Sequence, residues 1–129
     1  MELQIGDYLV ARGWSWAAEK LRASAERDLR DQRASGSPEP VASVSVFAMV
    51  HDGTEEPEAL KERLIAHVAS NLNSKWIGFT TTSKLGAEGF EVRLNEPPEH
   101  HYDILTPDLE DLDRFETLSK TFTDRRKAA

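Results

Sequence analysis

The strongest constraint on the fold is the run of residues 41–50, which becomes apolar on both of its alternating faces toward its end. Successive side chains of a β-strand point to opposite faces, so Val44 and Val46 share one face while Phe47 and Met49 share the other. A strand that is apolar on both faces is typical of the centre of a sheet that is covered on both sides. The run therefore predicts a central strand with packed layers above and below it.

The rest of the chain alternates between helical and strand patterns. Apolar residues at three- and four-residue steps predict helices, and alternation of apolar and polar residues predicts strands. In chain order we expect a helix at 7–33, the strand at 41–50, a helix at 54–72, strands at 76–82 and 89–95 joined by a loop at 83–88, a short edge strand at 100–105, and a helix that begins at 106–108. If the first two strands pair in parallel, the helix between them makes a crossover unit. The order α-β-α-β-β-(β)-α predicts an α+β fold, with a three- to four-stranded mixed or antiparallel sheet packed against about three helices.

A chain of 129 residues suits one domain with one core, here residues 1–129. Residues 34–40 contain one Gly and two Pro, so they end the first helix as a linker. The helix at 7–33 then either packs on the domain or extends from it as an arm. The basic residues 125–129 are expected to form a flexible tail. The expected core is Val44, Val46, Phe47, Leu64, Val68, Phe79, Phe90, Val92, Leu112 and Phe115.

The absence of cysteine excludes disulfides, thiolate metal sites and thiol nucleophiles. No apolar run is long enough to span a bilayer. The first residues lack the basic start and apolar stretch of a signal peptide. We therefore expect a cytoplasmic protein with no membrane partner and no cofactor.

Charge is distributed unevenly along the chain. The net charge is −7, which disfavours nucleic acid as a partner because phosphates would be repelled. Residues 96–116 carry eight carboxylates against one arginine. An acidic segment of this kind can bind a basic protein, and our candidate residues are Asp108, Glu110, Asp111 and Asp113. The alternative is a solvated surface near a helix N-terminus, where carboxylates are favoured in any case.

The N-terminal segment offers a second candidate for partner binding. On a helix at 7–33 one apolar stripe includes Trp14, and Trp16 lies about 200° away from it, in line with Leu9. Trp16 and Leu9 would then form a surplus apolar face for a second copy or a different protein. The alternative is that Gly13 breaks the helix and both tryptophans enter one core.

The histidines are the candidates for metal or acid–base chemistry. His51 ends a strand, and His100, His101 and Asp103 follow the double proline, so these residues could converge on a metal at the strand ends. Adjacent histidines of a strand point to opposite faces, so only one of His100 and His101 could join. The alternative is exposed loop histidines. We expect His67 to be partly buried and hydrogen-bonded.

The sequence contains no HExxH motif, no Gly-rich phosphate loop and no nucleophile elbow. We therefore expect a non-catalytic protein-binding domain of the inhibitor, immunity or assembly type. A small metal-dependent enzyme that uses His51 with His100 or His101 is the alternative. Residues 8–21 are superficially similar to a helix-turn-helix, which makes a DNA-binding regulator a minor alternative, although no second turn follows Leu21.

Overall fold

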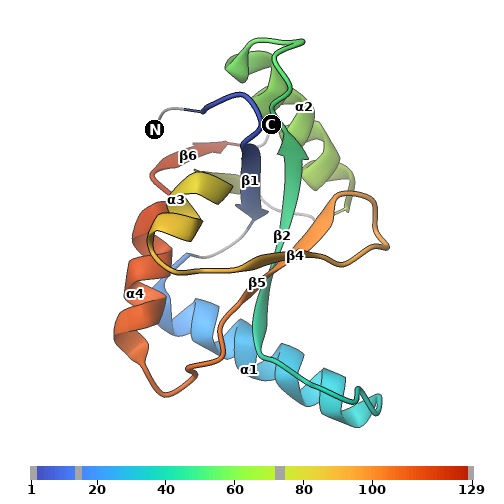
Figure 1. Cartoon of the computed structure of the whole chain (residues 1–129), viewed down its shortest axis with the longest axis vertical. Coiled ribbons are helices and arrows are strands. Elements are labelled where there is room, and N and C mark those ends of the chain that lie inside the picture. The colour runs from blue at the N-terminus through green and yellow to red at the C-terminus, as the bar shows by residue number, and fades with distance from the viewer. Residues whose placement is uncertain (1–2, 14–15, 72–74, 128–129) are drawn as a thin grey trace.

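The computed structural model describes residues 3–13, 16–71 and 75–127. Its helices and strands are β1 (Tyr8–Gly13), α1 (Ala18–Ala34), β2 (Ser43–Val50), α2 (Pro57–Asn71), β3 (Trp76–Thr81), α3 (Thr82–Ala87), β4 (Val92–Leu94), β5 (His101–Leu105), α4 (Leu112–Thr121) and β6 (Asp124–Lys127). The strands form one sheet in the order β4-β5-β2-β1-β3-β6, and every neighbouring pair is antiparallel (Figure 1). The expected α+β class is confirmed, but the described chain has six strands and four helices, more than the sequence predicts.

The expected helix at 7–33 is wrong over its first third. Residues 8–13 form strand β1, which pairs with β2 on one side and β3 on the other, so that Leu9 lies opposite both Met49 and Thr81. A short apolar run such as Leu9-Val10-Ala11 fits a buried strand as well as a helix. Pairing on both sides satisfies its backbone N–H and C=O groups in the middle of the sheet.

The helix that remains, α1, is not an arm. It packs against β2 and α4, and its connection to β2 is closed by Gln32. The Gln32 side-chain amide donates to the carbonyl oxygen of Val41 at 2.7 Å and accepts from the Val41 N–H at 2.9 Å. The expected linker 34–40 is thus the last residue of α1 followed by a short connection, and not a spacer between separate bodies.

The sheet is covered on both faces, as residues 41–50 predict. One face packs against α1, α3 and α4 through Val10, Val44 and Val46, and the other packs against α2 through Leu9 and Phe47. The core prediction is confirmed for eight of its residues. The other two, Val92 and Leu112, are half-buried and pack against the first of these clusters.

The connection through α2 is a split crossover. Strands β2 and β3 run in the same direction because both are antiparallel to β1, which lies between them. The expected parallel pairing of these two strands therefore does not form, because β1 is inserted between them. Strand β5 lies inside the sheet between β4 and β2 and is not an edge.

Two helix starts also differ from the prediction. The expected loop at 83–88 is largely helix α3, which begins where the Thr81 hydroxyl accepts the Lys84 N–H at 3.1 Å. Helix α4 begins at Leu112 with Asp111 as its N-cap, because the Asp111 carboxylate accepts the Asp113 N–H at 3.1 Å. The residues expected to start that helix belong instead to the connection after β5. No helix within the described ranges has the length and hydrophobicity needed to cross a bilayer.

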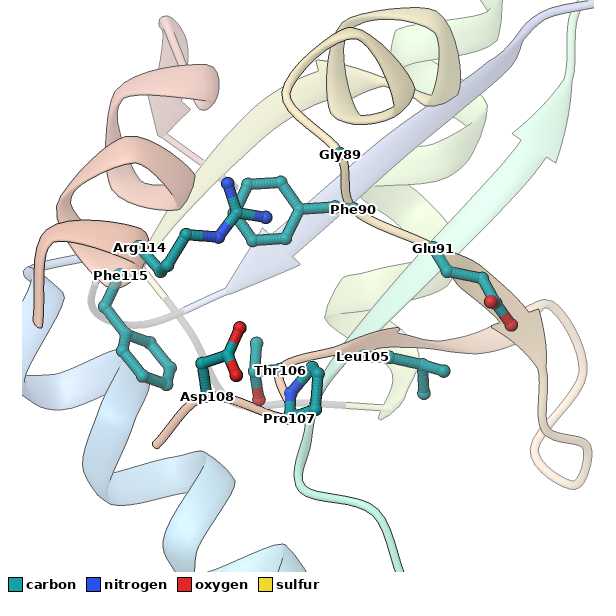
Figure 2. A pocket seen from close by; sticks show the side chains of 9 residues that line it. All are labelled: Gly89, Phe90, Glu91, Leu105, Thr106, Pro107, Asp108, Arg114 and Phe115. Carbon is teal, nitrogen blue, oxygen red and sulfur yellow. The ribbon is translucent and has the colours of Figure 1, made fainter. Parts of the chain in front are cut away.

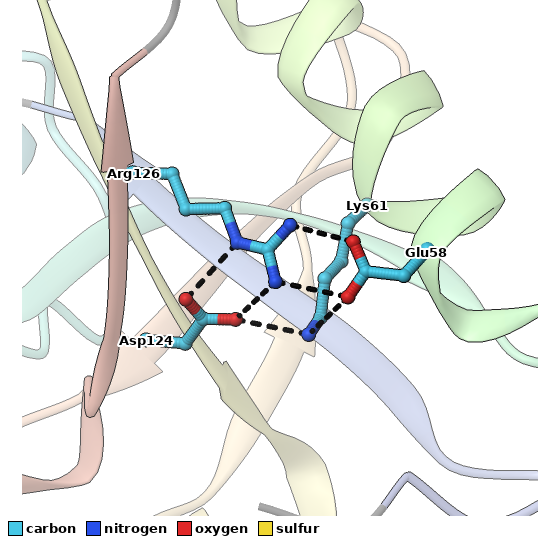
Figure 3. A network of polar contacts seen from close by, with 4 residues as sticks. All are labelled: Glu58, Lys61, Asp124 and Arg126. Atoms are coloured by element: carbon cyan, nitrogen blue, oxygen red, sulfur yellow. Dashed lines mark hydrogen bonds and ion pairs between the residues drawn. The ribbon is translucent and has the colours of Figure 1, made fainter.

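The expected flexible tail is wrong at residues 125–127, which belong to the edge strand β6. Figure 3 shows four charged side chains that join β6 to α2. The Arg126 guanidinium donates to both carboxylate oxygens of Glu58 at 2.6 and 2.9 Å, and its Nε donates to Asp124 at 3.1 Å. The Lys61 ammonium donates to Asp124 at 2.9 Å. Bidentate pairing gives this network a defined geometry that single surface ion pairs lack.

We expect acid to release this network. Hydrogen bonds from Arg126 lower the pKa of Glu58 from its ordinary value of 4.5 to about 2. Burial raises the pKa of Asp124, but hydrogen bonds from Arg126 and Lys61 outweigh it, so the net direction is downward. A carboxylate with a lowered pKa stabilises the fold fully above its unfolded pKa, and this contribution is lost as the pH falls toward the folded value. The Arg126→Gln variant should therefore be less stable than wild type at neutral pH, and the difference should shrink between about pH 4.5 and pH 2.

Urea denaturation at a series of pH values measures this difference. Arg30→Gln is the matched control, because Arg30 is exposed and makes no ion pair with the other described residues. Its curve should follow that of wild type. If the free energies of unfolding of wild type and Arg126→Gln differed by the same amount at every pH, the network would not hold β6 in place.

Candidate functional site

The structure buries both candidate residues of the N-terminal segment. Leu9 is fully buried beneath α2, and Trp16 is 9% exposed, with its indole Nε1–H donating to the carbonyl oxygen of Arg12 at 3.1 Å. The hypothesis of a surplus apolar helix face is wrong, because Leu9 lies on a strand and Trp16 lies in the connection after it. Of the alternative, in which Gly13 breaks the helix and both tryptophans enter one core, only the burial of Trp16 is confirmed, because the residues before Gly13 form a strand. Trp14 lies outside the described residues.

The candidate metal ligands do not converge. His101 lies opposite Phe47 on β2, four residues before His51, and four residues of strand span about 13 Å. Asp103 lies still farther along, opposite Ser45, and its carboxylate accepts the side-chain amide of Asn95 at 2.7 Å. Burial raises the pKa of Asp103. Over residues 3–13, 16–71 and 75–127, no three His, Asp or Glu side chains form a group that could hold a metal ion.

Two histidines instead contact Phe47, and a third contacts one of these two. The rings of His67 and His101 meet the Phe47 ring edge-on at centroid distances of 5.2 and 5.7 Å, and His100 meets His67 at 5.1 Å. The prediction for His67 is confirmed: it is half-buried, and its Nε2–H donates to the carbonyl oxygen of Glu99 at 2.6 Å. These contacts fasten the turn between β4 and β5 to the C-terminal part of α2.

A cavity of about 210 Å³ lies where the connection from α3 to β4 meets the connection from β5 to α4. Figure 2 shows its lining residues, which are Gly89, Phe90, Glu91, Leu105, Thr106, Pro107, Asp108, Arg114 and Phe115. Phe90 and Phe115 supply aromatic walls and Pro107 an apolar edge. The two connections are joined through β4 and β5, where the Leu105 N–H donates to the carbonyl oxygen of Glu91 at 2.9 Å.

The cavity carries one cation and one anion. The Arg114 guanidinium lies over the Phe90 ring at 4.1 Å, and its Nη1–H donates to the carbonyl oxygen of Glu88 at 2.8 Å. The Asp108 carboxylate is on the other side of the cavity in Figure 2, and it has no ion pair or hydrogen bond with any described residue. Glu91 turns away from the cavity and pairs with Arg93.

The floor of the cavity contains a buried hydroxyl without a partner. Thr106 is 5% exposed, and its Oγ1 has no hydrogen-bond partner among the residues that the structure describes. Leaving a buried hydroxyl unpaired is unfavourable, by about 1–3 kcal/mol in typical cases. The oxygen is itself buried, so it is not exposed to the space inside the cavity.

The acidic segment lies on the surface beside this cavity. Asp108, Glu110, Asp111 and Asp113 are all exposed, while the leucines between them, Leu109 and Leu112, pack against the core. Of the four carboxylates only Asp108 lines the cavity. The segment is thus held by its apolar residues and presents its charges to solvent.

Sequence reasoning missed the cavity. It assigned Thr106 to a helix start, Phe90 to the core and Arg114 to a minority charge in an acidic segment. No local pattern could have joined them, because the two connections meet only through the pairing of β4 with β5.

Comparison of the chain with protein-family models, with curated protein sequences and with solved structures finds no significant match.

Proposed function

We propose that this protein is a non-catalytic binding domain that docks on a basic protein partner through the acidic segment 108–113. The observation that carries the proposal is the exposure of four carboxylates within six residues, on a connection anchored by two leucines. Leu9 and Trp16 are buried, so they take no part in this docking. The cytoplasmic location expected from the sequence remains a prediction.

Helix capping accounts for only part of this acidity. Asp111 caps α4 and Asp113 lies in its first turn, where the helix dipole favours a negative charge. Asp108 and Glu110 precede the helix and make no side-chain hydrogen bond to other described residues. Their charges are therefore not required by the local structure. A surface of this kind accelerates association with a basic protein, and salt weakens the effect.

Neutralising the segment should slow association with such a partner. The test variant combines Asp108→Asn, Glu110→Gln, Asp111→Asn and Asp113→Asn, and the Asn at position 111 preserves the cap. Once a partner has been identified by cross-linking, surface plasmon resonance at low and high salt gives the association rate constant. We expect the variant to associate about tenfold or more slowly at low salt, and to show a weaker salt dependence.

The matched control removes four exposed carboxylates elsewhere: Glu19→Gln, Asp31→Asn, Glu56→Gln and Glu62→Gln. This control changes the net charge by the same amount as the test variant. It therefore distinguishes the effect of the charges in the segment 108–113 from the effect of the net charge of the protein. Equal association rates for the two variants would contradict a role for the segment and leave helix stabilisation as its explanation.

A further inference from the structure

The cavity of Figure 2 contains a cation and an anion that do not pair with each other. Arg114 is held on its own side by stacking on Phe90 and by its hydrogen bond to Glu88, which leaves its remaining N–H groups without a partner among the described residues. Asp108 faces it from the connection after β5. Opposite charges that lie on two sides of a hollow without pairing can both be satisfied by one bridging molecule.

Thr106 also lines the cavity, but its Oγ1 is buried and is not exposed to the space inside. The two charged side chains therefore carry the argument for a ligand, and the Thr106 hydroxyl does not.

The size and walls of the cavity restrict the ligand further. A volume of about 210 Å³ is below the range of about 300–1,000 Å³ typical of sites for drug-sized ligands. The rings of Phe90 and Phe115 and the Pro107 ring offer contact to a short apolar group. Glu91 pairs with Arg93 and points away from the cavity. Among the lining residues Asp108 is then the one carboxylate that faces Arg114 across the cavity, so the charges of the lining are balanced and do not favour a simple cation.

We propose that this cavity binds a small zwitterion of the α-amino acid type. Its carboxylate accepts from the free N–H groups of Arg114, its ammonium donates to Asp108, and its side chain lies against Phe115. This site is separate from protein docking by the acidic segment, with which it shares only Asp108.

Isothermal titration calorimetry with the twenty common L-amino acids as probes tests the proposal. For the best probe, its N-acetyl derivative lacks the ammonium and its amide lacks the carboxylate. Each derivative should bind about tenfold or more weakly, because a hydrogen bond to a charged group is lost at one end. Absence of binding by every amino acid at millimolar concentration would overturn the proposal, and so would equal binding of the derivatives.

Variants locate the binding site. Asp108→Asn and Arg114→Gln should each weaken the best probe about tenfold or more, while Asp113→Asn, an equal charge change outside the cavity, should not. Thr106→Val should leave binding unchanged, because the hydroxyl is not exposed to the cavity, and should leave thermal stability unchanged or raised, because it removes an unpaired buried hydroxyl. Equal affinity in Asp108→Asn and Asp113→Asn would exclude this cavity. If Arg114→Gln does not fold, NMR titration of the wild-type protein with the best probe tests the site instead. The backbone amide signals of Gly89, Thr106 and Arg114 should shift, and unshifted signals would reject the site.

Discussion

Replacing Phe115 with Ala is expected to lower the free energy of unfolding by about 3–5 kcal/mol. Phe115 is 1% exposed and lies on α4 in the cluster that joins this helix to α1 and the sheet. Truncation removes most of a buried ring and leaves a cavity that rigid neighbours fill only in part. Since small domains are stable by only about 5–15 kcal/mol, the variant should unfold at much lower urea concentration.

A neighbouring residue of the same helix provides the control. Glu116 is exposed, so Glu116→Ala should change stability by no more than about 0.5 kcal/mol. Urea denaturation followed by circular dichroism measures both variants. A soluble Phe115→Ala protein that unfolds at the wild-type midpoint would show that α4 does not pack where the structure places it.

Truncation of Trp16 should destabilise the protein by a similar amount, about 3–5 kcal/mol. The indole lies so close to Gly78 on β3 that a Cβ atom there would come within 2.7 Å of the ring. Gly78→Ala should therefore also destabilise the fold, by about 1–3 kcal/mol, because it overpacks the contact. In a Trp16→Ala background the space is empty, and Gly78→Ala should then have little effect.

The double-mutant cycle measures this coupling directly. Urea denaturation of the four proteins gives the coupling free energy, and light scattering on the same samples reports their oligomeric state. Additive effects of the two substitutions would mean that Trp16 does not lie over Gly78. A Trp16→Ala protein that stays fully stable but changes from dimer to monomer would restore the rejected hypothesis of a contact surface.

The central layer of the fold could be predicted from the sequence because its signals are local. Residues 41–50 are apolar on both faces wherever they pair, and the ladder through Leu60, Leu64 and Val68 fits only one side of a helix. Both features need no knowledge of distant partners. They correctly predict β2, α2 and the burial of most core residues.

Strands β1 and β6 could not be predicted because distant residues determine them. The first run, residues 8–13, is short enough to suit a helix or a strand, and its pairing with β2 and β3 decides the outcome. The other, Asp124 to Lys127, has low strand propensity. It is held by pairing with β3 and by ion pairs to Glu58 and Lys61, more than sixty residues earlier.

The candidate site also has one part that could be predicted from the sequence and one part that could not. Exposure of the acidic segment follows from its composition, and it was predicted. The cavity next to it depends on Arg114 and Thr106 meeting Phe90 from another connection, which only the folded sheet brings about. The metal hypothesis was wrong because strand register separates His51 from His101, and sequence alone does not give register.

The position of β1 also affects the order in which the molecule can be completed during synthesis. Among the described strands β1 is synthesised first and lies in the middle of the sheet, and its second neighbour, β3, is not made until residues 76–81 emerge. The side chain of Asp7, just before β1, likewise cannot accept its hydrogen bond from the Ser83 N–H until residue 83 has been synthesised. Until then one edge of an apolar strand stays open, the condition under which nascent chains pair with the wrong partner. A strand that is buried and paired on both sides in the finished protein thus keeps one open edge until β3 has been made.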